Sequence, residues 1–360
     1  MMVRNPALSR SVSVYLDAIR VVAATAVFLG HAVGFLGGLF WQLEPYQHEA
    51  VVIFFVLSGF LISYAVDRRE RSGASYAVAR AARMYSVVLL ALVVTVACDA
   101  IGARGTPSLY SAFGPSWHVL SEVFFVNQIW AASLQPGSNG PFWTLDYEVW
   151  FYVVFGLFLF VRGPWRWPVA LGATAIMGPW FAMLFPLWLA GVAAYRLTRL
   201  PLGRTWQWAL CLLPVAAWLV YEASALHGHR WLNGPSITGR KMYWQDVLVA
   251  VCFSLHLVGL AMLTRGRPCR VPMPVVRAIQ WCAGASFTMY LVHLPVMICL
   301  VAWMPWTRAS WLSRAVILIG VPVAVLLLAE LGERRKDAWR MAFQRILLGR
   351  QRHSGMSAAD

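Results

Sequence analysis

Two ionisable side chains in one apolar stretch have the types and the spacing for acid–base chemistry. Arg20 and His31 lie in LDAIRVVAATAVFLGH, residues 16–31, which is otherwise typical of a membrane-spanning helix. Eleven residues of α-helix make three turns plus about 20° of rotation and rise about 16 Å, so the two side chains share one face. Asp17, one turn from Arg20, is placed to pair with it. A neutral imidazole can act as a general base or a nucleophile; the alternative is an ion pair near the interface and a hydrogen-bonded core histidine.

A second pair of basic side chains follows in VDRRERSGASYAVARAARMY, residues 66–85. Arg80 and Arg83 are three residues apart, so they point the same way from the start of the next apolar helix. Paired guanidinium groups suit phosphate, because each of them donates two parallel hydrogen bonds. The alternative is the ordinary excess of positive charge beside a membrane span.

Two carboxylates lie in PFWTLDYEVWFYVV, residues 141–154. Asp146 and Glu148 are two residues apart, so on a helix they face nearly opposite sides. Glu148 shares its face with Thr144 and Tyr152, and we expect it to orient a histidine or balance its charge. We expect Asp146 to be solvated or to lie at the membrane interface.

Three hydrogen-bonding side chains share one face of SFTMYLVHLP, residues 286–295. Ser286, Tyr290 and His293 stand at i, i+4 and i+7. Such a polar stripe on an intramembrane helix predicts a lined cavity. The alternative is a set of hydrogen bonds that join packed helices.

Metal sites and the common nucleophile motifs have no counterpart in the chain. It contains no H-E-x-x-H, G-x-S-x-G or P-loop sequence, and we expect no metal. We read His48, His118, His227 and His229 as polar surface residues rather than ligands. The six cysteines form no C-x-x-C pair, so we expect small core residues rather than disulfides.

The elements that carry these residues follow from composition. The 360 residues are 60% hydrophobic and 12% charged, which excludes a soluble domain and indicates an integral membrane protein. Because a helix needs about 20 apolar residues to cross a bilayer, we predict an all-α polytopic bundle of about ten spans. The fifth span is short, and Gly178-Pro179 favours a broken hairpin over 167–197. The expected spans lie near residues 14–38, 49–66, 84–103, 142–161, 167–179, 180–197, 206–222, 244–264, 279–302 and 310–331.

Charge placement predicts the orientation of these spans. The net charge of +15 comes from clusters between apolar runs, so it indicates topology rather than nucleic-acid binding. With both termini cytoplasmic, most of the Lys and Arg residues face the inside. Residues 1–335 then form one membrane domain, without a cleaved signal peptide or a second soluble domain, and 336–360 form a basic tail on the anionic inner surface. The outer segments 104–141 and 223–243 are rich in Gly, Pro, Ser and Asn and are candidate lids or acceptor-binding loops.

Five motifs together give the chain a family resemblance. They are the R-x10-H of Arg20 and His31, FFVLSGFLIS at 54–63, the R-x-x-R of Arg80 and Arg83, FWTLDYE at 142–148 and SFTMYLVHLP at 286–295. In this order they resemble the acyltransferase 3 family of bacterial membrane O-acyltransferases, over about residues 14–331. The family often continues R-x-x-R-I-x-P, whereas Met84-Tyr85-Ser86 follows here.

The resemblance implies transfer of an acyl group, usually acetyl, from cytoplasmic acyl-CoA to a hydroxyl. The acceptor it implies is a carbohydrate, such as a polysaccharide or lipid-linked glycan outside the bacterial inner membrane. His31 would be the essential histidine, acting as general base or acyl carrier, and Glu148 would orient it. Arg80 and Arg83, with Arg20, would hold the phosphates of acyl-CoA.

The tetrahedral intermediate of such a transfer needs a hydrogen-bond donor, for which Ser286, Tyr290 and His293 are candidates. Membrane lipids surround the bundle, and nothing in the sequence predicts an oligomeric state. Three alternatives stay open: succinyl in place of acetyl, a small lipophilic acceptor such as a macrolide, and a transporter or flippase, which also uses intramembrane Arg, His and Glu.

Overall fold

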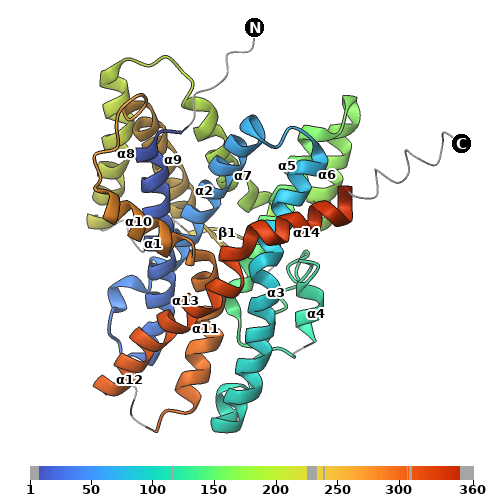
Figure 1. The fold of residues 1–360 in the computed structure, drawn as a ribbon, viewed down its shortest axis with the longest axis vertical. Coiled ribbons are helices and arrows are strands. Elements are labelled where there is room, and N and C mark those ends of the chain that lie inside the picture. Colours follow the sequence, from blue (N-terminus) through green and yellow to red (C-terminus); the bar gives the residue numbers. More distant parts are fainter. Residues whose placement is uncertain are drawn as a thin grey trace, which may run out of the picture. The chain divides into compact units, whose positions relative to one another are not determined.

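The computed structural model describes residues 8–115, 117–224, 233–237, 240–305, 307 and 310–348. Within these ranges almost every element is a helix, as predicted (Figure 1). The exception is a short antiparallel hairpin of β1 (Asn233–Ile237) and β2 (Arg240–Tyr243). The chain forms two compact units, here called unit 1 and unit 2. Unit 1 contains Met1–Ala23, His48–Ala65 and Met183–Ala283, and unit 2 contains Ala24–Gln47, Val66–Ala182 and Gly284–Asp360.

Unit 1 is held together by helices that approach closely at small residues. Gly59 of α2 packs against the backbone carbonyl of Trp188 in α7, and Gly191 of α7 packs against that of Val56. Residues without a side chain let two backbones meet in this way. The indole nitrogen of Trp188 donates to Ser58 Oγ over 3.2 Å. The described helices of this unit are the first part of α1 (Arg10–Ala32), most of α2 (Gln47–Arg68) and of α7 (Pro179–Leu197), α8 (Arg204–Ala223), α9 (Trp244–Leu263) and α10 (Met273–Ala283).

Unit 2 is built around one long helix, α3 (Gly73–Gly105), which runs for 33 residues. Ser72 and Ser75 form a capping box at its start. α11 (Ser286–Ala302) and α14 (Lys336–Leu348) both pack on α3. The other described helices are the end of α1, α4 (His118–Glu122), α5 (Trp143–Phe160), α6 (Arg166–Met177), α12 (Trp311–Ala315), a π-helical turn at Val316–Gly320 and α13 (Val321–Leu331), joined by short 3-10 turns.

Seven of the ten predicted spans have a counterpart among the described helices that is long and apolar enough to cross a membrane. The pair of α10 and α11, bent by 50°, makes an eighth if it is one span. The exceptions are α6, whose 12 residues rise only about 18 Å, and α8, whose 20 residues are long enough but not apolar enough. Gly178, with φ of 90°, ends α6, and this is the position at which the hairpin over 167–197 is predicted to be broken. The chain is therefore multi-pass, and the count of ten stays a prediction.

The segment between α3 and α5 does not simply cap the end of α3. Tyr110 packs against Gly102 near that end, but the hydroxyl of Tyr85 donates to the carbonyl of Val123 over 3.0 Å. Tyr85 and Gly102 are about 25 Å apart along the helix, so the segment runs back beside α3. Leu120 on α4 is 71% exposed while Glu122 is buried. The composition of 104–141 predicts a polar outer loop, but composition does not show how far that loop extends back beside α3.

Candidate active site

The histidines predicted on the first and ninth spans meet in unit 2. Nε2 of His293 on α11 lies 3.0 Å from Nδ1 of His31 in the last turn of α1. The ring centroids are 5.1 Å apart, with 37° between the ring planes. His293 is fully buried and His31 is half-buried. Two residues 262 positions apart thus form one imidazole pair.

Contacts with backbone carbonyls indicate which ring nitrogens of this pair carry a hydrogen. Nδ1 of His293 lies 2.8 Å from the carbonyl of Met289, which can only accept, so this nitrogen carries the hydrogen. Nε2 of His293 is then the acceptor for Nδ1–H of His31. Nδ1 of His31 also lies 3.0 Å from the carbonyl of Val27, in agreement with a hydrogen on that atom. His31 is thereby held in the Nδ1-protonated tautomer, with its lone pair on Nε2.

A proline explains how α11 is fixed beside the pair. Pro295 has no N–H, so the carbonyl of Leu291, four residues earlier, lacks its helical donor. The side-chain amide of Asn139 supplies the missing donor over 2.7 Å, and the same amide donates to Thr95 on α3 over 2.8 Å. Asn139 is fully buried and locks α11 to α3.

The loop that carries Asn139 is itself anchored by an ionisable residue of α3. Asp99 accepts from the backbone N–H of Ser138 over 3.0 Å and from its hydroxyl over 2.5 Å. Sequence reasoning missed Asp99 and Asn139. A signal for Asp99 was present, because a carboxylate within the predicted span 84–103 requires a partner.

Tyr290 lies one turn before His293 and also joins helices. Its hydroxyl is 2.8 Å from Thr144 Oγ1 on α5 and 3.3 Å from the carbonyl of Pro141. Ser286 is buried in the first turn of α11. Tyr290 thus makes hydrogen bonds between elements, which is the alternative to a lined cavity, and His293 pairs with His31. The lined cavity stays a prediction.

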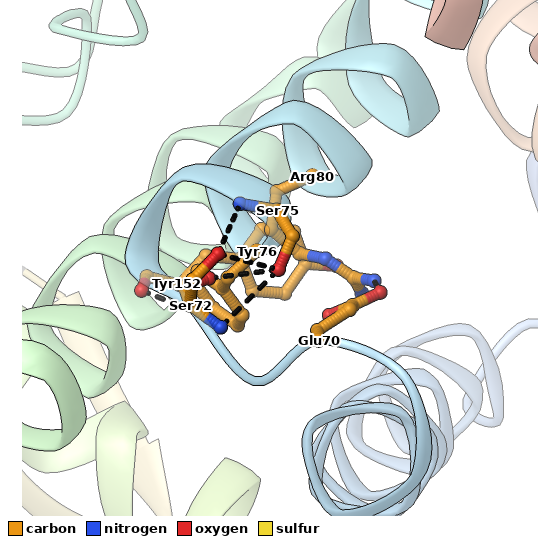
Figure 2. Close-up of polar contacts among 6 residues, drawn as sticks. All are labelled: Glu70, Ser72, Ser75, Tyr76, Arg80 and Tyr152. Atoms are coloured by element: carbon orange, nitrogen blue, oxygen red, sulfur yellow. Dashed lines mark hydrogen bonds and ion pairs between the residues drawn. The ribbon is translucent and has the colours of Figure 1, made fainter. Parts of the chain in front are cut away.

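Arg80 is held in a buried ion pair at the start of α3. Its guanidinium lies 2.6 Å from Glu70, which is 5% exposed, and Figure 2 shows the two side chains meeting end to end. The guanidinium also lies over the rings of Tyr76 and Tyr152, 5.6 and 5.7 Å from their centroids. Tyr76 in turn donates to the carbonyl of Tyr152 over 2.9 Å.

Arg83 stands beside the N-terminus of α11. Its guanidinium is 5.9 Å from the ring centroid of Phe287, is hydrogen-bonded to Tyr152 and is close to the carboxylates of Glu148 and Glu333. Glu333 accepts from the backbone N–H groups of Phe287 and Thr288 over 3.1 and 2.9 Å, and so caps α11. Sequence reasoning did not identify Glu333.

These contacts place Glu148 differently from expectation. It accepts a hydrogen bond from the hydroxyl of Tyr152 and lies near Arg83, whereas the group that contacts His31 is His293. Glu148 therefore belongs with the arginines in this structure.

The first helix carries the predicted ion pair. Arg20 Nη1 lies 3.9 Å from Asp17 Oδ1 on α1. These two residues belong to unit 1, whereas His31, eleven residues further along the same helix, belongs to unit 2.

Three further predictions from sequence need correction. His118 is buried and lies 3.1 Å from the carbonyl of Gln135, and His48 pairs with Asp246 over 3.0 Å, so neither is a simple surface residue. Asp146 is fully buried rather than solvated. Burial of Glu122 raises the pKa of its carboxyl group, and the neighbouring carboxylate of Asp146 raises that pKa further.

His227 and His229 lie outside the described residues. Within the described ranges, no group of three or more His, Cys, Asp and Glu side chains could hold a metal ion.

The chain matches a family described as an acyltransferase domain over residues 13–330. The exopolysaccharide production protein ExoZ of Rhizobium meliloti (strain 1021) is 36% identical over 147 residues, which cover 37% of this chain and 43% of that protein. The match thus spans less than half of the curated relative. No solved structure matches the chain.

Proposed function

The chain belongs to the acyltransferase 3 family, and we propose that it moves an acetyl group from acetyl-CoA to a hydroxyl of an exported or cell-surface carbohydrate. It is an acyltransferase with several apolar helices that can cross a membrane. The relative from Rhizobium meliloti is an exopolysaccharide production protein, which supports a polysaccharide acceptor. The apolar helices support a place in a membrane, and we propose the bacterial inner membrane. The observation that carries the proposal is the imidazole pair of His31 and His293.

The pair supplies the base that the reaction needs. A thioester is already activated, so the acceptor hydroxyl must lose its proton as its oxygen attacks the carbonyl carbon. Nε2 of His31 takes that proton, the carbon–sulfur bond breaks, and the thiolate of coenzyme A recovers the proton from the imidazolium. His293 accepts from Nδ1–H throughout and stabilises the cation. The alternative role for His31 is to carry the acyl group on Nε2 before the acceptor takes it.

We place the phosphates of the donor at the N-terminal end of α11. Phe287 contacts Arg83 and lies six residues before His293, about 9 Å along the helix. Phosphate would replace the carboxylates that now neutralise Arg80 and Arg83. Arg20 stays a prediction from sequence for donor binding, because it belongs to unit 1.

Two donors to the oxyanion remain proposed on α11. Tyr290 is one turn from His293 and Ser286 is two turns away on the same face. Because the hydroxyl of Tyr290 also bonds to Thr144, donating to the oxyanion requires that hydroxyl to change partner.

Mass spectrometry of cell-surface glycans tests the proposed function. Four strains carry the wild-type chain, no chain, the His31→Ala chain, or His256→Asn as a matched histidine control at equal membrane abundance. His256 contacts the carbonyl of Cys211 in unit 1 and has no role in the proposed chemistry. Acetyl mass should be present with wild type and the control and absent from the other two. Glycans of equal mass in all four strains would reject the proposal.

A further inference from the structure

One arginine of unit 2 uses only part of its hydrogen-bonding capacity. Arg314 lies on α12, which continues through the π-helical turn into α13 as one apolar helix. Its Nε donates to the carbonyl of Leu36 over 3.1 Å, and in the part of the chain that the structure describes it has no other hydrogen bond and no ion pair. The side chain is half-buried and its Nη atoms are not enclosed. Both Nη groups are therefore free to donate to a ligand.

The end of the first helix fixes this guanidinium in place. Leu36 ends the helical run that α1 begins: the N–H of Gly38 donates to the carbonyl of Val33 over 3.0 Å, and Gly37 has φ of 65°, as in a Schellman motif. Leu36 is fully buried, and its carbonyl takes a donor from outside the helix, which is Arg314. Because a guanidinium is planar, holding Nε also sets the direction of the Nη groups. Arg314 is thus pre-organised, unlike a mobile surface side chain.

The same helical run carries the proposed base. Leu36 follows His31 by five residues, which is about 8 Å along the helix axis. Leu36, His31 and Arg314 all belong to unit 2, so their spacing is set within one compact unit. With the predicted topology, this end of α1 and the start of α12 face the outside, where a carbohydrate acceptor is expected. A ligand held by Arg314 would therefore lie on the outer side of His31.

The charge and a neighbouring ring select the kind of ligand. One guanidinium with free Nη groups matches a carboxylate, which accepts two parallel hydrogen bonds and balances a single charge. Trp311 lies three residues before Arg314, so the two side chains leave the helix on the same side. Its side chain is 78% exposed, and such a ring offers a large apolar face on which the C–H face of a sugar packs. The cation and the ring together suit a sugar acid.

We propose that Arg314 and Trp311 form a binding subsite for a carboxylate-bearing sugar of the acceptor. Arg314 binds the carboxylate through its Nη groups, and the indole of Trp311 packs on the sugar ring that carries it. No bond is made or broken at this subsite, so it determines which glycan binds and leaves the rate of transfer to the histidine pair. The identity of this sugar as part of the acceptor rests on the proposed function, whereas binding can be measured without turnover.

Equilibrium binding to the full chain in lipid nanodiscs tests the subsite. The probe is a tritiated tetrasaccharide of glucuronic acid, and its matched control is the same tetrasaccharide with every carboxyl group reduced to an alcohol. All chains carry His31→Ala, so that no transfer can occur. The charged form should bind about tenfold more tightly than the reduced form, and Arg314→Gln should abolish that preference. Arg314→Lys keeps the charge but not the paired donors, so it should keep only part of the preference.

A second arginine supplies the matched control. Arg104 is an exposed residue in the last turn of α3, also on the predicted outer side, and Arg104→Gln should leave the preference unchanged. Trp311→Leu should weaken the binding of both forms equally, because packing on the ring does not depend on the carboxylate, and unchanged binding would overturn the part assigned to this ring. Equal binding of the two forms by the chain that keeps Arg314, an undiminished preference in Arg314→Gln, or no binding of either form would overturn the proposal.

Kinetics separates failure of the subsite from failure of the proposed reaction. In a chain that keeps His31, Arg314→Gln should raise the KM for oligosaccharide released from the glycan of a strain without the chain about tenfold, with kcat and the KM for acetyl-CoA unchanged. Reduction of the carboxyl groups of that oligosaccharide should raise the KM of the wild-type chain by the same factor. A chain that shows the binding preference but transfers no acetyl group keeps the subsite and rejects the proposed function. An unchanged KM for oligosaccharide in Arg314→Gln overturns the assignment to the acceptor.

Discussion

Replacement of His293 by phenylalanine removes one of the two acceptors of Nδ1–H of His31, leaves the carbonyl of Val27 as the other, and keeps a ring in the buried site. His293 is fully buried and its Nε2 lies 3.0 Å from that Nδ1. Because the imidazolium forms only during the reaction, this hydrogen bond becomes charge-assisted near the transition state. Hydrogen bonds to charged groups contribute about 1.5–3 kcal/mol. We therefore expect kcat to fall about 10- to 150-fold, with the KM for acetyl-CoA unchanged.

The assay is transfer of labelled acetyl from acetyl-CoA to oligosaccharide by the purified chain in lipid. His293→Gln supplies a carbonyl oxygen as a substitute acceptor, so it should react about tenfold faster than His293→Phe. Met297→Leu changes another fully buried residue of α11 at nearly constant volume and should keep the wild-type kcat.

Two results would refute the reasoning. Wild-type kcat in His293→Phe would show that His31 needs no acceptor besides the carbonyl of Val27. Equal loss in the phenylalanine and glutamine variants, with Met297→Leu active, would reduce His293 to a packing role.

Three further predictions concern stability and donor binding. Arg80→Ala should lower the free energy of unfolding by about 3–5 kcal/mol, because it leaves the buried carboxylate of Glu70 uncompensated. Adding Glu70→Gln should restore most of that free energy in thermal unfolding scans. The single and the double variant should both show a higher KM for acetyl-CoA, and unchanged binding would return Arg80 to a topological role. Asn139→Ala should lower the free energy of unfolding by about 1–3 kcal/mol, because the carbonyl of Leu291 on α11 loses its donor. Pro295→Ala restores the helical N–H for that carbonyl, so the double variant should recover part of the lost free energy. Additive effects in the double variant would contradict the account. Burial and a neighbouring carboxylate raise the pKa of Glu122, so over part of the pH range the folded state binds a proton that the unfolded chain has lost. The free energy of unfolding should therefore fall as pH rises from about 5 to 8. Glu122→Gln should flatten this pH dependence, and equal slopes in wild type and variant would refute the prediction.

Sequence patterns predicted the helices better than their contacts. The apolar runs marked most of the helices, and the spacing of Arg20 and Asp17 predicted their ion pair. The runs could not show that α10 and α11 are bent by 50°, because apolar composition continues across the break. The depth of the segment beside α3 was equally hidden, since polar residues bury well when they have partners.

Pairing between helices limited the prediction of the site. Each polar stripe was visible alone, but which stripe faces which depends on packing that periodicity does not encode. His293 was therefore expected near an oxyanion, whereas the structure pairs it with His31. Glu148 was expected beside a histidine and lies with Arg83. Pro295 indicates that the carbonyl of Leu291 lacks a donor, but only the path of the neighbouring loop shows that Asn139 supplies one.

The central claim is that Nε2 of His31 takes the proton of the acceptor. The most direct test is kcat of purified, folded His31→Ala with labelled acetyl-CoA and oligosaccharide, beside wild type. A general base contributes about 10²- to 10⁴-fold, so the account predicts a fall of at least about a hundredfold. A rate within about twofold of wild type, in a chain with an unchanged unfolding temperature, would contradict it.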